Sequence, residues 1–474
     1  MKIELKDPVF GQLAALADKL QIQTFVVGGY VRDLFLNRTS KDVDIVVVGD
    51  GIEFAKAFAA LLPEKTDFAV FKTYGTAMVK TTDWEIEFVG ARKESYQRDS
   101  RKPDVEAGSI KEDQLRRDFT MNALAISLNA GNLFELVDPF NGVEDLEKKV
   151  IKTPLDPGIT FDDDPLRMMR AIRFSTQLDF YIDPVTFNAI KLYAGRIKIV
   201  SAERITEEFH KIMASKKPGK GLNQLFEAGL LQIIFPELYA MQGVEVINKQ
   251  AHKDNFYHTL QVLDNICLET NNIWLRWAAL LHDIGKPSCK RFTPAEGGWT
   301  FHGHEDKGSR MVSNIFRRLK LPLNEKMKYV EKLVALHHRP KALAEQGVTD
   351  SAIRRLIVDT EADLDDLFTL CRADMTSRNQ EKIKYYRSNL LKVQQLVNEV
   401  EERDALRNWQ PPVTGEDIMM YFNIKPSKEV GIIKNEIREA ILEGKIKNNF
   451  EEAKVLMIEI GQQLGLTGKL LDQN

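Results

Sequence analysis

The alternation of apolar and polar positions divides the chain into an N-terminal part and a longer C-terminal part of different character. Between about residues 24 and 140, short runs rich in β-branched and aromatic residues alternate with stretches of helical periodicity, which predicts mixed α/β structure. The strand-like runs are TFVV, VDIVVV, FAVFK, TAMVK, WEIEFVG, ALAIS and FELV. After residue 158 this strand signal disappears, and apolar residues recur at helical spacing instead.

The helical part is itself divided by its content. The segments LRMMRAIRFSTQL, RITEEFHKIM and LNQLFEAGLLQIIF predict a first group of helices, with the basic turn SKKPGKG before the last of them. Seven of the eight histidines fall in a second block, between residues 252 and 338. A long charged helix is expected at about residues 380–407, and a last helical segment with Gly444 as its C-cap. We therefore expect four regions, at residues 1–150, 151–245, 246–405 and 406–474.

Length, charge and cysteine usage narrow the class of protein. The 474 residues are too many for one ordinary core, so several domains are expected. The net charge is only −3, and any nucleic-acid contact must therefore come from local basic patches. The three cysteines are scattered without a CxxC pair, which indicates a reducing compartment. With no apolar leader in MKIELKDPVF and no run of membrane-spanning length, we expect a cytoplasmic protein without membrane contact.

Two aspartates lie two positions apart in one predicted strand. Because alternate side chains of a strand share a face, Asp42 and Asp44 point the same way, while Val43 and Ile45 point into a core. Two neighbouring carboxylates repel each other unless a positive charge lies between them. By the same alternation Glu87, in WEIEFVG, faces away from the core and could complete a carboxylate cluster. A merely polar sheet face is the alternative reading.

The segment before these aspartates favours phosphate chemistry. Gly28 and Gly29 follow a predicted strand and open a helix, where backbone N–H groups can receive phosphate. Arg32, one turn further, carries a fork of donors suited to phosphate oxygens. Aspartate oxygens are ligands for Mg²⁺, and the phosphates of a bound nucleotide supply others. The pattern therefore predicts a magnesium and polyphosphate site.

Four segments, GGYVRD, DVDIVV, LRRDFTMNA and DDPLRMMRAIRF, follow one another in the N-terminal part of the chain. In this order and spacing they resemble the class II tRNA nucleotidyltransferase and bacterial poly(A) polymerase family. The resemblance implies an α+β nucleotidyltransferase head with a small mixed sheet, followed by an all-helical neck. Asp42 and Asp44 match the family's metal-binding aspartates, and Glu87 falls where it places a third acidic residue. The positions that match its nucleotide-binding motifs are Gly28, Gly29, Arg32, Arg117, Asp118, Asp163, Asp164, Arg167 and Arg170.

Two of these matches carry further expectations. Asp118 could accept a hydrogen bond from a ribose hydroxyl or form a structural salt bridge, and both readings stay open. The family motif is Glu-Asp-x-x-Arg, and here Asp163 replaces the glutamate. Asp164 and Arg167 are three apart and can project from one face of a helix start. Cytosine and adenine both present an amino donor beside a ring acceptor, so this pair can accept C and A and reject U and G. The alternative reading makes Asp164 an N-cap followed by Pro165.

The histidine block contains DNFYHTLQVLDN, WAALLHDIGKP, FHGHEDKGSRM, ALHHRP and CRADMTSRN. Imidazole combined with carboxylate suits a divalent metal. The block resembles an HD phosphohydrolase domain, which implies hydrolysis of phosphomonoesters or cyclic phosphodiesters at a divalent metal of unknown identity. The residues that match its metal ligands, or could hold a second ion, are His258, His282, Asp283, His304, His337, His338 and Asp374. Lys286 could stabilise phosphate charge.

The combined reading is a tRNA nucleotidyltransferase that adds C and A to the tRNA 3′ end from CTP and ATP, fused to an HD domain. A poly(A) polymerase and a specialist that adds only A or only CC stay open. A hypothesis of another class is an HD phosphohydrolase whose first half only binds RNA, which the clustered aspartates disfavour. Oligomeric state is unknown. The lysines expected to contact tRNA are Lys216, Lys217, Lys220, Lys425, Lys428 and Lys434.

Overall fold

The computed structural model has two compact units, Met1–Ala240 and Met241–Asn474. The structure describes residues 1–62, 66–72, 75–95, 104–247, 250–251, 253–296, 298–346, 349–377, 379–404 and 411–468. The predicted end of the long charged helix at residue 407 lies outside this range. The finer division into four regions stays a prediction.

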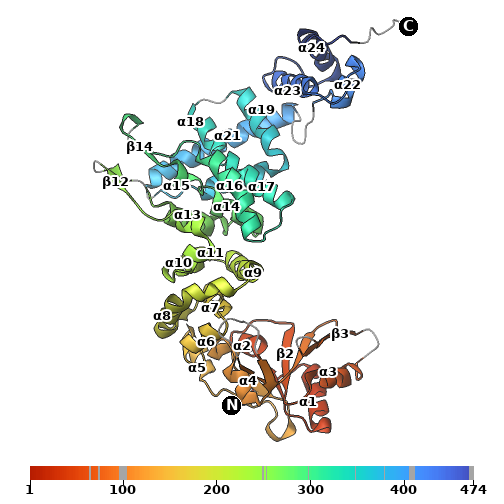
Figure 1. The fold of residues 1–474 in the computed structure, drawn as a ribbon, viewed down its shortest axis with the longest axis vertical. Helices are drawn as coiled ribbons and strands as arrows, with labels where there is room; N and C mark the ends of the chain where they lie inside the picture. Colours follow the sequence, from red (N-terminus) through yellow and green to blue (C-terminus); the bar gives the residue numbers. More distant parts are fainter. Residues whose placement is uncertain are drawn as a thin grey trace. The chain divides into compact units, whose positions relative to one another are not determined.

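A seven-stranded mixed sheet forms the centre of the first unit (Figure 1), in the order β3-β4-β5-β2-β1-β8-β9. Its strands are β1 Thr24–Val27, β2 Asp42–Val47, β3 Asp67–Phe71, β4 Thr76–Lys80, β5 Glu85–Gly90, β8 Ala125–Ser127 and β9 Leu136–Val137. β2 and β5 are parallel, and the other neighbours are antiparallel. The strand-like runs read from the sequence are therefore confirmed. A separate hairpin joins β6 Arg92–Ser95 to β7 Asp104–Ala107.

Amphipathic helices cover this sheet. Helix α3 Gly51–Ala59 packs on β4 and β5 and also contacts α1 Pro8–Leu20. The seven-residue helix α2 Gly29–Phe35 packs on β1 and β2. A Cβ built on Gly51 would lie 2.7 Å from the Gly90 nitrogen. The backbone after β2 therefore crosses the end of β5 at a distance that only glycine permits.

The first unit becomes mostly helical toward its C-terminal end. Its remaining helices are α4 Ile110–Leu115, α5 Gly142–Glu147, α6 Pro157–Asp163, α7 Leu166–Leu178, α8 Pro184–Tyr193, α9 Ala202–Met213, α10 Pro218–Glu227, α11 Leu230–Ile234 and α12 Pro236–Tyr239. Helix α7 packs against both α9 and α10. Gly221 on α10 permits this packing, because a Cβ there would lie 2.5 Å from Thr176 Oγ1.

The expectation that strands end at residue 158 is wrong in detail. β11 Tyr181–Ile182 pairs with β10 Val150–Ile151 in a parallel ladder. Short hairpins also join β12 Val246–Ile247 to β13 Gln250–Ala251 and β14 Arg291–Thr293 to β15 Gly298–Thr300. These strands are two or three residues long. Alternation of apolar and polar positions cannot be recognised over so short a run.

The second unit is mostly helical. Its helices are α13 Asn255–Ile266, α14 Ile273–Leu281, α15 Lys286–Cys289, α16 His304–Arg318, α17 Glu325–Leu336, α18 Arg339–Gln346, α19 Asp350–Thr360, α20 Leu364–Ala373, α21 Gln380–Asp404, α22 Gly415–Phe422, α23 Lys428–Leu442 and α24 Phe450–Gln463. Trp277 and Phe316 are among its fully buried aromatic residues. The last three helices share a small apolar core that includes Phe422, Ile437 and Met457. Gly444 follows α23 in the left-handed conformation, as expected for a helix end.

Candidate functional site

Three acidic side chains meet on one face of the sheet in the first unit. Asp42 is in register with Glu85, and Asp44 is in register with Glu87, on the parallel strands β2 and β5. The side chains between them, such as Val43 and Ile86, are buried. Asp42 and Glu87 are exposed and Asp44 is half-buried, so the predicted alternation holds. Glu85 instead pairs with Lys80.

Gly28 brings the backbone of the β1–α2 turn directly against Asp44. Its φ is +76°, in the left-handed region that favours glycine. A Cβ built there would lie 3.0 Å from Asp44 Oδ2 and 3.0 Å from an Nη atom of Arg117. Any side chain at this position would therefore enter the space between the carboxylate and the guanidinium.

The electrostatics of Asp44 favour a cation. Burial raises the pKa of the Asp44 carboxyl, and the nearby Arg117 opposes that rise. The carboxylates of Glu87, Asp42 and Asp113 raise the pKa of Asp44 further. Clustered oxygen donors that repel one another are the donor set that a hard divalent cation such as Mg²⁺ requires. The residues present therefore fit the expected metal.

The arginine of the first motif, predicted to bind nucleotide, is already engaged. Arg32 donates through Nε and Nη2 to the Asp33 carboxylate, at 2.8 and 2.9 Å, and through Nη1 to Asn122 Oδ1 at 3.0 Å. Its guanidinium also lies 5.2 Å from the centre of the Phe174 ring. Each nitrogen of the fork expected from the sequence thus already donates to a protein group. Gly29 begins helix α2, as predicted.

Asp113 was not among the site residues predicted from the sequence. Its carboxylate is fully buried and binds Arg117 through one oxygen, at 3.0 and 3.1 Å, and Arg116 through the other. Burial alone would raise the pKa of Asp113, but the two arginines hold it below its usual value. The ion pair between Asp113 and Arg117 fixes the guanidinium that lies beside Asp44. The sequence did contain a signal for these ion pairs, because the acidic residue is followed by arginines three and four positions later, a spacing that brings side chains together on a helix.

Asp118 forms the salt bridge that was one of its two expected roles. Its Oδ2 accepts from Arg170 on α7, at 2.6 and 2.7 Å, and its Oδ1 accepts from Asn122 and from the Phe119 amide, each at 2.9 Å. Burial opposes ionisation, but Arg170 and Asn122 keep the pKa of Asp118 below its usual value. Asp118 therefore ties the segment after α4 to helix α7.

The predicted base-reading residues lie where α6 meets α7. Helix α6 ends at Asp163 and α7 begins at Leu166, so Asp164 lies between the helices rather than opening one. Its Oδ1 nevertheless accepts from the Leu166 amide at 3.1 Å, which is the action of a cap. Asp163, Asp164 and Arg167 are all half-buried. Arg167 is close enough to Asp118 to contribute to the lowered pKa of that carboxyl.

The lysines expected to contact RNA differ in their surroundings. Lys220 donates to Asp179 at 2.8 Å and to the Phe180 carbonyl at 3.1 Å. This pairing reduces the positive charge that Lys220 offers. The side chains that are exposed are those of Lys216, Lys217, Lys425, Lys428 and Lys434.

In the second unit, residues from five helical segments converge on Asp283. His258 lies on α13, His282 and Asp283 directly follow α14, His304 begins α16, His337 and His338 follow α17, and Asp374 follows α20. His258 Nε2 lies 2.9 Å from Asp374 Oδ1 and 3.5 Å from Asp283 Oδ2. The Nε2 atoms of His282 and His304 lie 3.2 and 3.3 Å from the Asp283 carboxylate. The structure thus brings together every metal ligand predicted for this block.

Backbone carbonyls orient three of these imidazoles. The Nδ1 atoms of His282, His304 and His337 lie 2.8, 2.9 and 2.7 Å from the carbonyl oxygens of Ala279, Phe301 and Val334. Their buried Nε2 atoms have no hydrogen-bond partner of good geometry within the described residues, and neither has Asp283 Oδ1. Metal-binding histidines characteristically use one nitrogen for a carbonyl and the other for the ion. These Nε2 atoms are therefore suited to bind a metal ion.

The cluster divides into two ligand groups that share one carboxylate. His258, His282 and Asp283 form one group, and Asp283, His304, His337 and His338 form the other. Burial lowers the pKa of His338 to about 4 and, with His282 and His338 nearby, that of His337 well below its usual range. Neutral imidazoles keep the lone pair that a metal needs. The residues of both groups could hold divalent cations, and Asp283 belongs to both groups.

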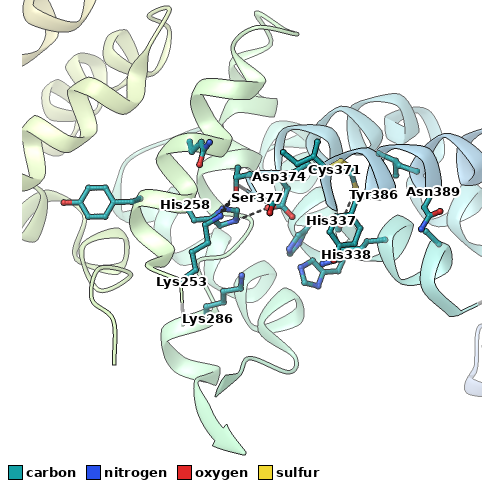
Figure 2. A pocket seen from close by; sticks show the side chains of 18 of the residues that line it. Lys253, His258, Lys286, His337, His338, Cys371, Asp374, Ser377, Tyr386 and Asn389 are labelled. Atoms are coloured by element: carbon teal, nitrogen blue, oxygen red, sulfur yellow. Dashed lines mark hydrogen bonds and ion pairs between the residues drawn. The ribbon is translucent and has the colours of Figure 1, made fainter. Parts of the chain in front are cut away.

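Further residues around the cluster were not predicted. Glu305 lies 3.0 Å from His338 Nδ1, and Thr376 Oγ1 lies 2.8 Å from His258 Nδ1. Lys253 Nζ lies 2.9 Å from the same His258 nitrogen (Figure 2). Lys286, which was predicted, donates to Asp283 Oδ2 at 2.5 Å. Lys253 and Thr376 could not be predicted from the sequence, because only the folded chain brings them into contact with His258.

The chain matches three family models. The Poly A polymerase head domain covers residues 24–152, the probable RNA and SrmB-binding site of polymerase A covers 179–241, and the HD domain covers 255–379. The chain is 30% identical over 430 residues to an A-adding tRNA nucleotidyltransferase of Deinococcus radiodurans, which is 89% of this chain and 92% of that protein. This chain belongs to the tRNA nucleotidyltransferase and poly(A) polymerase family. It is an enzyme of that class with an HD domain, as the motifs predicted.

Other similar proteins agree with this assignment. A multifunctional CCA protein of Hahella chejuensis is 34% identical over 318 residues, covering 64% of this chain and 69% of that protein. A tRNA nucleotidyltransferase solved with a primer tRNA and an ATP analogue has a TM-score of 0.55 and 25% identity, over 81% of this chain and 99% of that one. A CCA-adding enzyme without ligand shares the fold, with a TM-score of 0.62 over 98% and 96% of the two chains at 24% identity. Among the described residues, no helix is both long and apolar enough to cross a membrane.

Proposed function

We propose that the carboxylate site transfers nucleotides from CTP and ATP to the 3′ end of a tRNA. The observation that carries the proposal is the register that sets Asp44 beside Glu87, two positions along β2 from Asp42. The relatives named for CCA or A addition support the same substrate class. They also make a poly(A) polymerase, or a phosphohydrolase with a passive RNA-binding module, the less favoured reading.

In the proposed reaction the 3′-hydroxyl oxygen of tRNA attacks the α-phosphorus of the nucleotide. A new phosphorus–oxygen bond forms, the bond to pyrophosphate breaks, and the hydroxyl proton leaves to solvent or a carboxylate. Bound Mg²⁺ ions would stabilise the charge on the phosphates and lower the pKa of the attacking hydroxyl. Asp42, Asp44 and Glu87 would hold them. Arg117, fixed by Asp113, would lie next to the triphosphate and balance its negative charge.

We assign the choice of base to the start of helix α7. A carboxylate at Asp164 and a guanidinium at Arg167 can together pair with the amino donor and ring acceptor that cytosine and adenine share. Uracil and guanine present a carbonyl and a ring N–H in those positions and would leave both protein groups unpaired. The cap made by Asp164 engages Oδ1 of its carboxylate, which accepts from the Leu166 amide. Arg170, held by Asp118, is assigned to the same nucleotide pocket.

A second activity is proposed for the histidine centre. The Nε2 atoms of His282, His304 and His337 face the Asp283 carboxylate without a hydrogen bond of good geometry among the described residues. They support a bound divalent metal, whose identity is left open. Such a metal would supply hydroxide near neutral pH. Lys286, close to Asp283, is placed to stabilise phosphate charge. We assign this centre to the hydrolysis of phosphomonoesters or cyclic phosphodiesters.

One experiment separates the alternatives for the first site. The protein is incubated with tRNA that lacks its 3′-terminal CCA, with tRNA that ends in CC, and with each labelled nucleotide. Addition of C, C and A to the first substrate is expected. Addition of A to the second substrate alone would identify an A-adding specialist, and a long A tail would identify a poly(A) polymerase. Absence of any addition, with tRNA binding intact, would contradict the transferase proposal.

A further inference from the structure

The ring of Phe174 lies among three arginine side chains in the first unit. Phe174 is on α7, and only 7% of the residue is exposed. The guanidinium carbons of Arg173, Arg32 and Arg170 lie 4.2, 5.2 and 5.5 Å from the centre of its ring. A guanidinium within about 6 Å of a ring centre is attracted by the negative charge of the ring face. One buried ring is therefore close enough to attract three cations.

The charges of these three arginines oppose one another. Arg173 Nε lies 3.1 Å from Glu208 Oε2 on α9, and both side chains are buried. Burial lowers the pKa of Arg173, and the charges of Arg170 and Arg32 lower this pKa further, although Glu208 opposes the shift. The guanidinium groups thus repel each other, and the face of the Phe174 ring offsets part of this repulsion.

The position of the ring is itself fixed by the core. Phe119, which is fully buried, meets Phe174 edge to face, with ring centres 5.8 Å apart and an angle of 85° between the ring planes. Aromatic pairs prefer such a geometry. The Phe119 amide donates to Asp118, the carboxylate that also binds Arg170. The ring and one of its guanidinium neighbours are therefore both held by the same short segment of the chain.

Two of the three arginines are assigned to the bound nucleotide. Arg32, on α2, is the predicted phosphate-binding arginine, and Arg170, on α7, is assigned to the nucleotide pocket. Their guanidinium groups come from different parts of the first unit, and both lie near the Phe174 ring. The ring is thus a common support for two groups that would contact one ligand.

We propose that Phe174 is a positioning residue for nucleotide binding, whose aromatic face holds Arg32 and Arg170 in the arrangement that receives the nucleotide. The inference rests on the nucleotidyl transfer proposed above for this unit. Groups that are already held in place lose less conformational freedom when a ligand binds, so the ring increases nucleotide affinity. The metal-binding carboxylates lie on β2 and β5, and the ring should therefore affect affinity more than the rate of the chemical step.

The test changes the charge distribution of the ring while keeping its shape. Fluorine atoms withdraw electron density from a ring face and weaken its attraction for a cation. Full-length protein is prepared with phenylalanine, 3,5-difluorophenylalanine or 3,4,5-trifluorophenylalanine at position 174. Addition of CTP to tRNA that lacks its CCA end, and of ATP to tRNA that ends in CC, is followed in single turnovers. These measurements give the dissociation constant of the nucleotide and the maximal rate separately.

The dissociation constant should rise with each degree of fluorination, by about 10-fold for the trifluorinated ring, because two cation–ring contacts weaken together. The maximal rate should change little. Phe174→Leu removes the ring face and should raise the dissociation constant at least as much. Phe58→Leu is the matched control and should leave the constant unchanged, since Phe58 is fully buried on α3 and packs against Phe88, with ring centres 5.7 Å apart.

Equal dissociation constants for the three rings, or the same rise in Phe58→Leu as in Phe174→Leu, would overturn the positioning role. The fluorinated proteins decide if Phe174→Leu does not fold, because they keep the packing of the ring. If the wild type adds no nucleotide to either tRNA, the transferase proposal fails. Equilibrium binding of CTP and ATP to the three ring forms is then compared. Weaker binding with increasing fluorination would support the role of Phe174, and equal binding would overturn it.

Discussion

The sheet of the first unit and the helices of the second unit present clusters of different candidate metal ligands. On the sheet, Asp42 and Glu87 are exposed and only oxygen atoms are offered. Among the helices, His282, Asp283 and His337 are buried, and imidazole nitrogens converge on one shared carboxylate. The first site offers few ligands, and the second offers a nearly complete set.

From this difference we expect the two sites to bind their metal ions at different stages, one together with its substrate and the other before it. A hard cation on three carboxylates needs further oxygen ligands, which a nucleotide triphosphate would bring. The sheet site would thus be completed by its substrate. The histidine centre can hold an ion before substrate arrives, because backbone carbonyls already orient its Nε2 atoms.

The largest effect is expected at the sheet. Asp42→Ala or Asp44→Ala should reduce nucleotide addition about 10³-fold, because metal stabilisation of the phosphates supplies several kcal/mol and each 1.4 kcal/mol is a tenfold change in rate. Affinity for tRNA should stay near that of the wild type. Glu85→Ala is the control, since Glu85 shares the face but pairs with Lys80, and its rate should change little. Near wild-type addition by both aspartate variants would refute the metal assignment.

The next effect concerns the histidine centre alone. His282→Ala should lower the metal content of the purified protein and reduce phosphoester hydrolysis by at least about 10–100-fold, the range seen even for residues that only support a ligand. Nucleotide addition should be unchanged, because the two ligand clusters share no residue. His302→Ala serves as the control, since His302 is 77% exposed and pairs with Glu296 outside the cluster. Loss of both activities in a folded variant would contradict the independence of the sites.

The two sites also differ in how far the sequence predicted them. Strand alternation was sufficient to place Asp42 and Asp44 on one face of β2 and Glu87 on the outward face of β5, because a period of two fixes the direction of each side chain within its own strand. The histidine motifs predicted the ligands, but their division into two groups around Asp283 depends on how five helical segments pack. Contacts between residues distant in sequence carry no local pattern. Thr376, which is 118 positions from His258, could not be found for that reason.

A smaller effect is expected on base selection. Arg167→Ala removes the donor that would read the ring acceptor of C and A, so incorporation of both should fall. A site that hydrogen-bonds a base rejects analogues strongly, because an analogue leaves buried groups of the protein unpaired. In the variant we expect the preference for CTP and ATP over UTP and GTP to fall by about 10-fold to 100-fold. The control is Arg204→Ala, at an exposed arginine on α9. Unchanged relative use of the four nucleotides, with lower stability, would make this position structural only.

The smallest effect is a change in stability at the sheet site. Burial, opposed by Arg117 and reinforced by Glu87 and Asp42, raises the pKa of Asp44 in the folded protein. The ionised carboxylate therefore destabilises the fold at neutral pH, and this cost is relieved as the pH falls through the folded-state pKa, where Asp44 becomes neutral. Asp44→Asn is neutral at every pH.

Calorimetry in EDTA should accordingly find the Tm of the full-length Asp44→Asn variant higher than that of the wild type at pH 8, by about 2 °C, the scale of one modest interaction. The difference should shrink as the pH is lowered, because the wild type then loses the same charge. Added Mg²⁺ should reverse the sign, since only the wild type can bind it there. Asp83→Asn, at an exposed carboxylate on the β4–β5 turn, should change the Tm under none of these conditions. An Asp44→Asn variant that is less stable than the wild type in EDTA would show that the Asp44 carboxylate stabilises the sheet through Arg117. The ionised carboxylate would then not destabilise the fold in the absence of a cation.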